Sequence, residues 1–408
     1  MEYLDGGVTA AKGYKAAGVR AGIKPLADNK DMAMVYSESP AVVAGTFTKN
    51  VVRALPVRWD KEVVESGKPV QAIVVNSGIA NACTGQEGYE NCKKEAVRTG
   101  QLLNLDPGAV LIGSTGVIGA QLNMEVIESG IEKLVPELKD TTEAGTMAAE
   151  AILTTDTHKK EIAVSVEVGG KTVTIGGMCK GAGMIHPNMG TMLCFVTSDA
   201  VVEKAFLQKS LLSIVEDSFN MISVDGDTST NDTCLVLCNG LAENPVINDT
   251  NPDKEAFLEA LREVLTYLAK QIAGDGEGCT RLFEVTCNGA KSKKDAKIIA
   301  KSVVCSNLTK AAIFGKDANW GRILCAMGYS GVIFDPDKVD ITLESEYGSL
   351  SIVKNGIATD YSEEVATQIL SADPVKAILD IHEGEESATA WGCDLTYEYV
   401  KINADYRS

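Results

Sequence analysis

Short apolar runs, separated by longer segments in which apolar residues have helical spacing, constrain the fold of this chain more than any other feature. Each run is long enough for a buried strand and too short for a helix. Four of them predict strands, at 72–75, 110–112, 193–197 and 235–237. Alternating apolar residues at 339–343 and 350–353 predict a later hairpin, and residues 397–402 predict a last strand.

Two segments have the apolar spacing of helices. One starts near Pro252, with Thr250 or Asn251 as its N-cap, and stops at Gly274. The other covers about residues 202–218. Strands that alternate with helices indicate an α/β protein, although their order alone does not fix the topology.

Charge excludes several classes of function. Of the 408 residues, 38 are Lys or Arg and 56 are Asp or Glu, so the formal net charge is −18. The phosphate backbone would repel such a chain, and we expect no nucleic-acid partner. No stretch reaches the roughly 20 apolar residues of a membrane span, and the opening MEYLDGG has no secretory pattern. We therefore expect a cytoplasmic protein that does not enter a membrane.

Cysteine and histidine do not form metal-binding patterns. The eleven cysteines are scattered without a CxxC pair, which predicts buried free thiols in a reducing compartment. The three histidines, His158, His186 and His382, are far apart in the sequence, so we expect no multi-histidine zinc site and no bound metal.

Three polar or glycine-rich segments have both structural and functional interpretations. Residues 113–116 (GSTG) follow an apolar run, and their backbone N–H groups either form a plain strand-to-helix turn or bind an anion or an oxyanion. Residues 225–232 fail as a calcium loop, since Thr230 replaces the required glycine, and predict a polar loop between strands. Residues 274–278 predict a turn that presents Glu277 between two glycines.

The segment KGAGMIHPNMGTML, residues 180–193, carries the most information about chemistry. Its threonine, Thr191, opens an apolar strand, which is usually a structural role. If the chain breaks before Thr191, however, the new α-amino group can act as base for the hydroxyl of the same residue. The reference pKa of such an amine, about 7.7–8.0, suits this role at neutral pH.

This segment resembles the cleavage site of the ornithine acetyltransferase family, the bifunctional glutamate N-acetyltransferases of arginine biosynthesis. The similarity extends over essentially the whole chain. One departure is Gly190, where family members commonly have alanine before the catalytic threonine. Further segments that match are GGVTAAKGYKAAGVRAGIK, FTKNVVRALPV, VVNSGIANACTG, GSTGVIG, TTDTHKK, DGDTSTNDT, GDGEGCTRL, GKDANWGRI and INADYRS.

The resemblance implies a layered α/β sandwich with a C-terminal α/β subdomain from about residue 285. The chain would cleave itself between Gly190 and Thr191 into an α chain, 1–190, and a β chain, 191–408. The two chains would stay together and assemble as a dimer of αβ units.

The resemblance also implies a reaction. Thr191 would take the acetyl group of N2-acetyl-L-ornithine, and L-glutamate would then accept it, with no cofactor or metal. Thr115 and Gly116 match the oxyanion-hole pair. The positions that match substrate-binding residues are Thr157, Lys180, Thr191, Glu277, Asn403 and Ser408. Lys180 suits a substrate carboxylate and Glu277 the ornithine ammonium.

Other functions stay open at this point. The same nucleophile would serve a self-processing aminopeptidase or amidase of related fold, with water as acceptor. A non-enzymatic small-molecule binding protein would need Thr191 only as a structural residue. The sequence does not decide whether acetyl-CoA is a second acetyl donor, or whether pathway products inhibit the protein.

Overall fold

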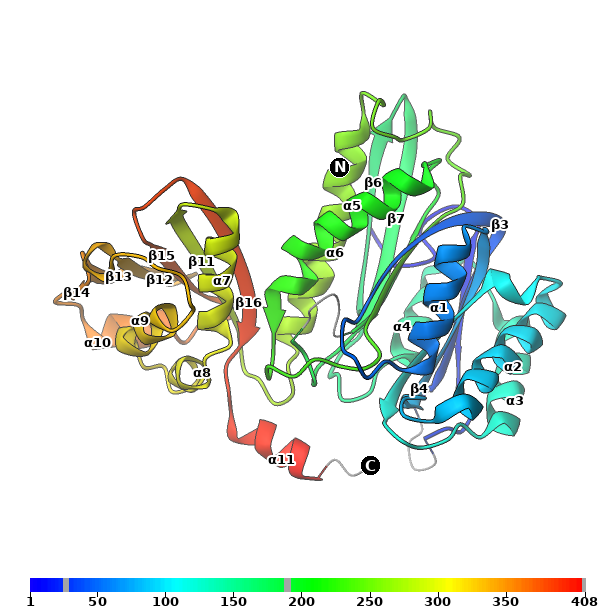
Figure 1. Ribbon diagram of the computed structural model, residues 1–408, viewed down its shortest axis with the longest axis horizontal. Coiled ribbons are helices and arrows are strands. Elements are labelled where there is room, and N and C mark those ends of the chain that lie inside the picture. The colour runs from blue at the N-terminus through cyan, green and yellow to red at the C-terminus, as the bar shows by residue number, and fades with distance from the viewer. Residues whose placement is uncertain (25–28, 187–191, 406–408) are drawn as a thin grey trace.

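The computed structural model describes residues 1–24, 29–186 and 192–405, which form two β-sheets with helices packed on them (Figure 1). The larger sheet consists of β1 (Glu2–Leu4), β2 (Tyr14–Val19), β3 (Met32–Phe47), β4 (Val70–Ile79), β5 (Val110–Val117), β6 (Lys160–Val168), β7 (Lys171–Lys180), β8 (Leu193–Ser198) and β10 (Thr233–Cys238). The α-helices that accompany it are α1 (Leu55–Ser66), α2 (Gly85–Leu103), α3 (Met124–Glu137), α4 (Thr142–Ala151), α5 (Lys204–Asp217) and α6 (Lys254–Gly274).

The centre of the larger sheet is buried on both faces. Its strand order is β1-β6-β7-β8-β10-β3-β4-β5, with β2 beside β3. Strand β8 is parallel to β10 and antiparallel to β7. Because side chains alternate along a strand, Cys194 and Val196 join the hydrophobic cluster of α5 and α6, whereas Phe195 joins that of α4. Helices on both faces therefore give the predicted layered sandwich.

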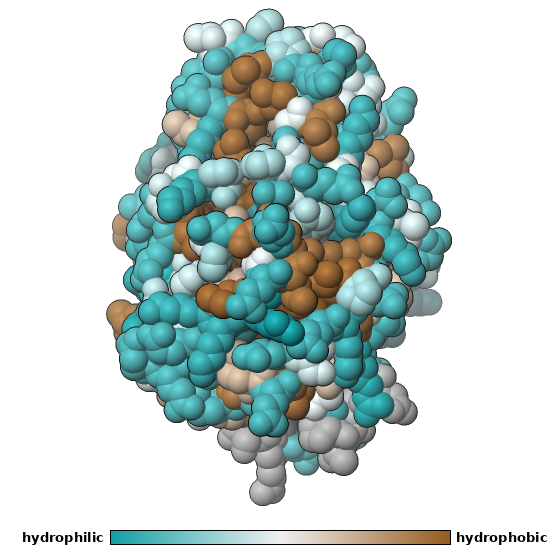
Figure 2. Space-filling model, turned by 90° about the vertical axis from the view of Figure 1, so that its right-hand side faces the viewer, coloured by the Kyte–Doolittle hydropathy of each residue, from teal (hydrophilic) through white to brown (hydrophobic). Residues whose placement is uncertain are grey.

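Helices α2 and α3 pack against each other, and α3 also contacts β2 (Figure 1). The buried residues of α3, such as Ile127, Ile131 and Leu134, follow the spacing of a single helical face. On the side of the molecule that Figure 2 faces, hydrophilic residues cover most of the surface and hydrophobic ones form smaller patches. Among the described residues, no helix has the length and hydropathy that crossing a membrane requires.

The smaller sheet has the strand order β14-β13-β12-β15-β11-β16-β9. Its strands are β9 (Ile222–Ser223), β11 (Leu282–Ala290), β12 (Asp340–Ser345), β13 (Gly348–Lys354), β14 (Ile357–Ala358), β15 (Val375–Asp380) and β16 (Glu386–Cys393). The helices of this part are α7 (Lys293–Val304), α8 (Asn307–Phe314), α9 (Trp320–Gly328), α10 (Glu363–Ile369) and α11 (Tyr397–Asp405). Short 3₁₀ turns lie at Pro107–Ala109, Phe219–Met221 and Pro336–Lys338.

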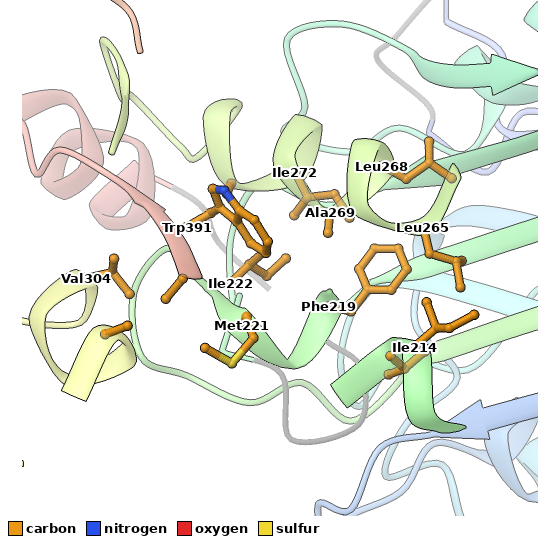
Figure 3. Close-up of a cluster of buried hydrophobic side chains, with 14 of the residues drawn as sticks. Ile214, Phe219, Met221, Ile222, Leu265, Leu268, Ala269, Ile272, Val304 and Trp391 are labelled. Carbon is orange, nitrogen blue, oxygen red and sulfur yellow. The ribbon is translucent and has the colours of Figure 1, made fainter. Parts of the chain in front are cut away.

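A shared hydrophobic core joins the two sheets (Figure 3). Strand β9 comes from the middle of the chain but pairs in parallel with β16 through Ile222 and Trp391. Trp391 and Ile222 lie in one buried cluster with Ile272 of α6 and Val304 of α7. The smaller sheet and its helices therefore share one hydrophobic core with the elements of the larger sheet.

Most predicted elements are confirmed, with differences at their ends. The four apolar runs lie in β4, β5, β8 and β10, and β12 pairs with β13 as the predicted hairpin. The predicted helices are α6 and α5, but Asp253 rather than Thr250 or Asn251 occupies the N-cap position of α6. The segment 225–232 is the expected loop, between β9 and β10, and all eleven cysteines are free. Cys83 and Cys325, however, are exposed rather than buried.

Two local predictions are wrong. Residues 397–402 form the helix α11 instead of a strand, and none of its residues is buried. Without a neighbouring strand, an extended segment would leave its backbone groups unpaired, while a helix pairs them internally. The segment 113–116 is part of β5, which runs on to Val117, and is not a strand-to-helix turn.

Candidate active site

A cavity of about 160 Å³ lies where β5, β7 and the start of β8 meet the loops before β10 and after α6. We call it the Lys180 cavity. Five residues predicted for the site line it: Thr115, Gly116, Lys180, Glu277 and Asn403. The remaining lining residues are Ala80, Ile118, Thr154, Thr155, Gly183, Met184, Ile185, Met192, Leu193, Ser229, Thr230, Asn231 and Asp232.

Close approach of two backbones explains the glycine at position 116. Gly116 lies opposite Gly78 of β4, and the register between the two strands shifts at the next residue, Ile79. The φ angle of Gly116 is +130°, and a Cβ there would lie closer than 3.0 Å to the Gly78 carbonyl group. Irregular strand ends of this kind are common beside active sites. Here the irregularity places the end of β5, with Thr115, at the cavity wall.

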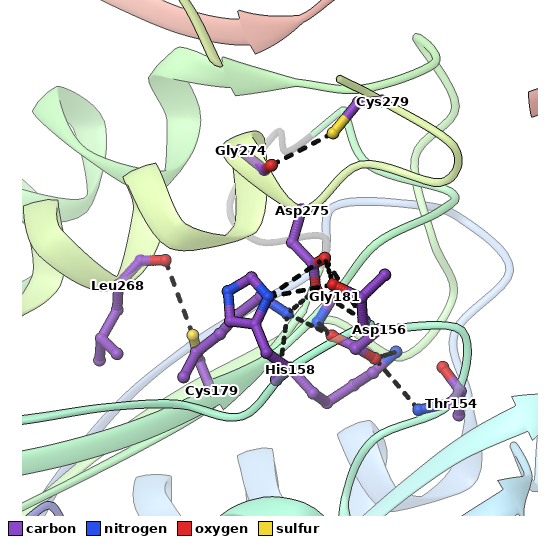
Figure 4. A network of polar contacts seen from close by, with 12 residues as sticks. Thr154, Asp156, His158, Cys179, Gly181, Leu268, Gly274, Asp275 and Cys279 are labelled. Atoms are coloured by element: carbon purple, nitrogen blue, oxygen red, sulfur yellow. Dashed lines mark hydrogen bonds and ion pairs between the residues drawn. The ribbon is translucent and has the colours of Figure 1, made fainter. Parts of the chain in front are cut away.

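Lys180 belongs to a buried network with Lys160 and two acids, Asp156 and Asp275, which Figure 4 labels. Lys180 is the last residue of β7, and its Nζ is 3.8 Å from Asp156 Oδ2. Asp156 also binds Lys160 Nζ at 2.8 Å and accepts a hydrogen bond from the Gly181 amide at 2.6 Å. Lys160 in turn lies 2.5 Å from Asp275 Oδ2. All of these charges are paired, as buried charges must be.

Opposite charges favour the ionised forms of Asp156 and Lys160. Burial alone would raise the pKa of Asp156, but the positive charges of Lys180 and Lys160 outweigh it and hold that pKa well below its usual range. Burial likewise opposes the charge of Lys160, while Asp156 and Asp275 raise its pKa above the ordinary value. A second cation, Lys24, is close enough to Lys180 to lower the Lys24 pKa further, although burial is the main cause.

Thr157 belongs to this network rather than to the cavity wall. Its backbone N–H and its hydroxyl both donate to the Asp275 carboxylate, and its Oγ1 lies 3.0 Å from His158 Nδ1. It is not among the residues that line the Lys180 cavity. Thr157 is exposed, and a chain of contacts through Asp275, Lys160 and Asp156 connects it to Lys180.

Glu277 lines the same cavity, beside the loop that follows β7. Its backbone N–H donates to the Ala182 carbonyl at 2.9 Å, which ties the turn after α6 to the loop after β7. Asn403 of α11 donates from Nδ2 to Glu277 Oε2 at 2.7 Å. The carboxylate fits against Gly183, where a Cβ would lie closer than 3.0 Å to it. The C-terminal helix therefore reaches the cavity, although the chain folds through a second sheet before it.

The loop before the predicted cleavage site is held by Asp225. That carboxylate accepts hydrogen bonds from the amides of Met184 and Ile185, at 2.7 and 2.9 Å. Met184 adopts a left-handed φ of +57°, which this pair of bonds stabilises. After the cleavage site, Thr233 N–H donates to the Met192 carbonyl at 2.9 Å. Both chain segments that flank residues 187–191 are thus fixed at the cavity.

Three predicted positions lie outside the described residues: Gly190, Thr191 and Ser408. Met192, which follows Thr191 in the chain, lines the cavity together with Leu193. Covalent connection keeps the Cα atoms of successive residues about 3.8 Å apart. The predicted nucleophile thus directly precedes, in the sequence, a residue that lines the cavity.

Sequence reasoning missed several residues of the site. Asp156, Lys160 and Asp275 position Lys180, yet Asp275 is more than a hundred residues away from the other two in the sequence. Asn231 donates from Nδ2 to the carbonyls of Ala80 and Ser114, at 2.6 and 2.7 Å. The matched segments TTDTHKK and DGDTSTNDT contain Asp156, Lys160 and Asn231, and GDGEGCTRL contains Asp275, but only the fold shows which of these residues meet.

The arrangement suits a small ligand that carries both charges. The cavity presents the ammonium of Lys180 and the carboxylate of Glu277, with Met184, Ile185 and Met192 as apolar walls. Opposite charges at a fixed separation orient a zwitterionic molecule. In the described ranges there is no group of three or more His, Cys, Asp or Glu residues that could hold a metal ion.

Comparisons with known proteins agree with one another. A family model described as the ArgJ family matches residues 15–408. The arginine biosynthesis bifunctional protein ArgJ of Caldanaerobacter subterraneus subsp. tengcongensis is 50% identical over 408 residues, which is 100% of both chains. A crystal structure of the arginine biosynthesis bifunctional protein ArgJ of Bacillus halodurans is 48% identical with a TM-score of 0.50, covering 52% of this chain and 98% of the solved one.

An ornithine acetyltransferase of Mycobacterium tuberculosis, solved in complex with ornithine, is 37% identical with a TM-score of 0.42, covering 47% of this chain and 98% of the solved one. The family match and the full-length identity confirm the family that the motifs predicted. The chain belongs to the ArgJ family.

Proposed function

We propose that this chain transfers the acetyl group of N2-acetyl-L-ornithine to L-glutamate through an acetyl-Thr191 enzyme, giving L-ornithine and N-acetyl-L-glutamate. The observation that carries the proposal is the Lys180 cavity itself. It combines Lys180, Glu277, Thr115 and Gly116 with Met192, the neighbour of the predicted nucleophile. The full-length identity with ArgJ proteins supports the same reaction.

The reaction proceeds in two steps that use one nucleophile. Thr191 Oγ attacks the acetyl carbonyl carbon, and its proton passes to the Thr191 α-amine. Backbone and hydroxyl donors at Thr115 and Gly116 stabilise the oxyanion, a contribution of about 2.7–4 kcal/mol for each donor in comparable enzymes. The C–N bond breaks, and ornithine leaves with the proton. The amine of glutamate then attacks the acetyl ester and regenerates Thr191.

Opposite charges in the cavity orient the substrate. Lys180 binds its carboxylate, and Glu277, held by Asn403, binds the side-chain ammonium of ornithine. Thr157 and Ser408 complete the proposed substrate-binding set, with Thr157 acting through Asp275. The mechanism requires neither a metal nor a cofactor, and acetyl-CoA serves as a second acetyl donor, as the name "bifunctional" of the relatives suggests.

Self-cleavage between Gly190 and Thr191 prepares the nucleophile, giving an α chain of 1–190 and a β chain of 191–408. The solved Bacillus halodurans chain is matched over 98% of its length by 52% of this chain, so it is about half as long, as one product of such a cut would be. We further propose that two αβ units form a dimer, and that the enzyme works in the cytoplasm.

Isotope transfer tests the reaction directly. Incubation with N2-[acetyl-¹⁴C]acetylornithine alone should label the β chain at its N-terminal peptide, and added glutamate should remove the label as N-acetylglutamate. Thr191→Ala should give one uncut, unlabelled chain, and Thr191→Ser should retain part of both activities because it keeps the hydroxyl. Release of free acetate at the rate of acetylornithine consumption would instead indicate a hydrolase. Cleavage of the Thr191→Ala chain would refute the assigned nucleophile.

A further inference from the structure

A second cavity, of about 480 Å³, lies between β3, α1 and α5 and concentrates positive charge. We call it the Arg53 cavity. Its charged lining residues are Lys49, Arg53, Arg58, Lys61, Lys204 and Glu65. Five cations and one anion stand out in a chain whose formal net charge is −18. Such a cluster attracts an anion with several charges.

Most of these cations have no partner within the protein. In the described part of the chain, the side chains of Lys49, Arg53 and Arg58 make no hydrogen bond or ion pair. Lys61 lies 3.6 Å from Glu65 on the same helix, an exposed contact of little energy. All three are exposed, and their like charges around one cavity give a positive potential that attracts a polyanion.

The Arg53 cavity has an apolar part to its lining, and a hydroxyl group without a partner is buried beneath its surface. Thr46 is only 2% exposed, and its hydroxyl makes no hydrogen bond. Buried hydroxyl groups nearly always have a partner. Phe47, Val57 and Val64 form the apolar part of the lining. A heterocycle can pack on this apolar lining, and phosphates attached to it would then meet the cations.

The Arg53 cavity and the Lys180 cavity share a wall. Thr48 lines the Arg53 cavity, and its hydroxyl donates to the Ser229 carbonyl at 2.9 Å. Its backbone N–H donates to the Asp232 carbonyl at 3.0 Å. Ser229 and Asp232 both line the Lys180 cavity. A ligand bound at the Arg53 cavity therefore lies next to the proposed site of acetyl transfer.

A third cavity also carries lysines, but neighbouring carboxylates offset part of their charge. It is lined by lysines of α7, and two of them, Lys293 and Lys297, pair with Asp217 at 2.6 and 2.5 Å. Glu216 is a further anion in its lining. The positive charge available to a ligand is therefore smaller there than at the Arg53 cavity.

We propose that the Arg53 cavity binds the phosphate-bearing adenosine end of acetyl-CoA, with the pantetheine arm leading to Thr191. This inference rests on the proposed function, which supplies Thr191 as acetyl acceptor. In the step itself the acetyl C–S bond breaks and the acetyl–Oγ bond of Thr191 forms. The hydroxyl proton ends on the thiol of coenzyme A. Glutamate then takes the acetyl group as it does after acetylornithine.

The test separates this site from the reaction of acetylornithine. The charge-reversal variant Arg53→Glu/Arg58→Glu should weaken binding of coenzyme A, measured by calorimetry, by about tenfold or more, because two charge-assisted phosphate contacts become repulsive. The KM for acetyl-CoA should rise with it, and kcat/KM for acetylornithine should stay within about twofold. Lys133→Glu/Lys171→Glu, two exposed lysines outside the cavity, is the control of equal charge change.

Each contrary result has its own meaning. Unchanged affinity for coenzyme A in the Arg53→Glu/Arg58→Glu variant, or an equal loss in the control, would overturn the site. If Lys294→Glu weakened coenzyme A binding and Arg53→Glu/Arg58→Glu did not, the binding site would be the cavity at α7 instead. Wild-type protein that binds no coenzyme A but transfers acetyl from acetylornithine would overturn this inference and leave the proposed function standing. Dephospho-coenzyme A should bind more weakly than coenzyme A, and equal binding would contradict a role for the cations.

Discussion

Replacing Gly183 with alanine should displace the Glu277 carboxylate from the Lys180 cavity while the fold persists. The new Cβ would lie closer than 3.0 Å to the carboxyl group of Glu277. Glu277 meets it with the end of a flexible side chain, which can rotate away, and the φ angle of Gly183 is not in the left-handed region. The substitution therefore changes the position of one charge rather than the path of the backbone.

The magnitude follows from the contact that is lost. A hydrogen bond to a charged group contributes about 1.5–3 kcal/mol, which corresponds to roughly ten- to a hundredfold in kcat/KM. The loss should concern acetylornithine. N2-acetylnorvaline, which has no side-chain ammonium, should react with the wild type and with Gly183→Ala at nearly equal rates. The assay is the initial rate of N-acetylglutamate formation with each donor.

Two controls make the reasoning refutable. Gly328→Ala introduces the same methyl group where nothing lies within 4 Å, and it should leave both donors unaffected. Glu277→Gln combined with Gly183→Ala should be no slower with acetylornithine than Glu277→Gln alone, because both changes remove one interaction. Additive losses in the double variant would show that alanine acts through the loop. An unchanged preference for acetylornithine in Gly183→Ala would remove Glu277 from the ammonium site.

Four further outcomes are expected. Burial raises the pKa of Glu95 to about 8, whereas the pKa of this group in the unfolded chain is about 4.3. Between these two pH values the folded protein holds one more proton than the unfolded chain, so its stability falls as pH rises toward 8. Glu95→Gln should therefore raise the melting temperature at pH 8 and leave it unchanged at pH 4. Gly116→Ala would force a Cβ into the Gly78 backbone and should abolish acetyl transfer and lower the melting temperature. Trp391→Ala should lower the free energy of unfolding in urea by about 3–5 kcal/mol. Deletion of residues 404–408 should raise the KM for acetylornithine or abolish transfer, while gels still show two chains.

The sequence predicted the centre of the larger sheet because those strands are buried on both faces. The run at 193–197 is apolar at nearly every position, and β8 is buried throughout. Residues 397–402 misled the prediction because none of their β-branched and aromatic side chains is buried in α11, where burial does not decide the conformation. The pairing of β9 with β16, between residues far apart in the chain, has no local signal at all.

The sequence likewise predicted some residues of the site and not others. Family motifs located Lys180 and Glu277, and the fold brings both to one cavity. They could not reveal that Asp156, Lys160 and Asp275 hold Lys180, because that network depends on how β6, β7 and the end of α6 meet. Thr157 matched a substrate-binding position as well, and the fold shows that it donates hydrogen bonds to Asp275 of the same network.

The pairing of β7 with β8 has a consequence for a chain that is cut between them. Cys179 and Lys180 of β7 are in register with Cys194 and Leu193 of β8, and β10 pairs with β3 across the same division. The cut would leave every one of these contacts in place, so the native structure would change little. Once denatured, however, the halves would diffuse apart as separate molecules. Renaturation of the mature enzyme would then be second order in protein and would depend on its concentration. The uncut precursor, as a single chain, would refold in a first-order reaction.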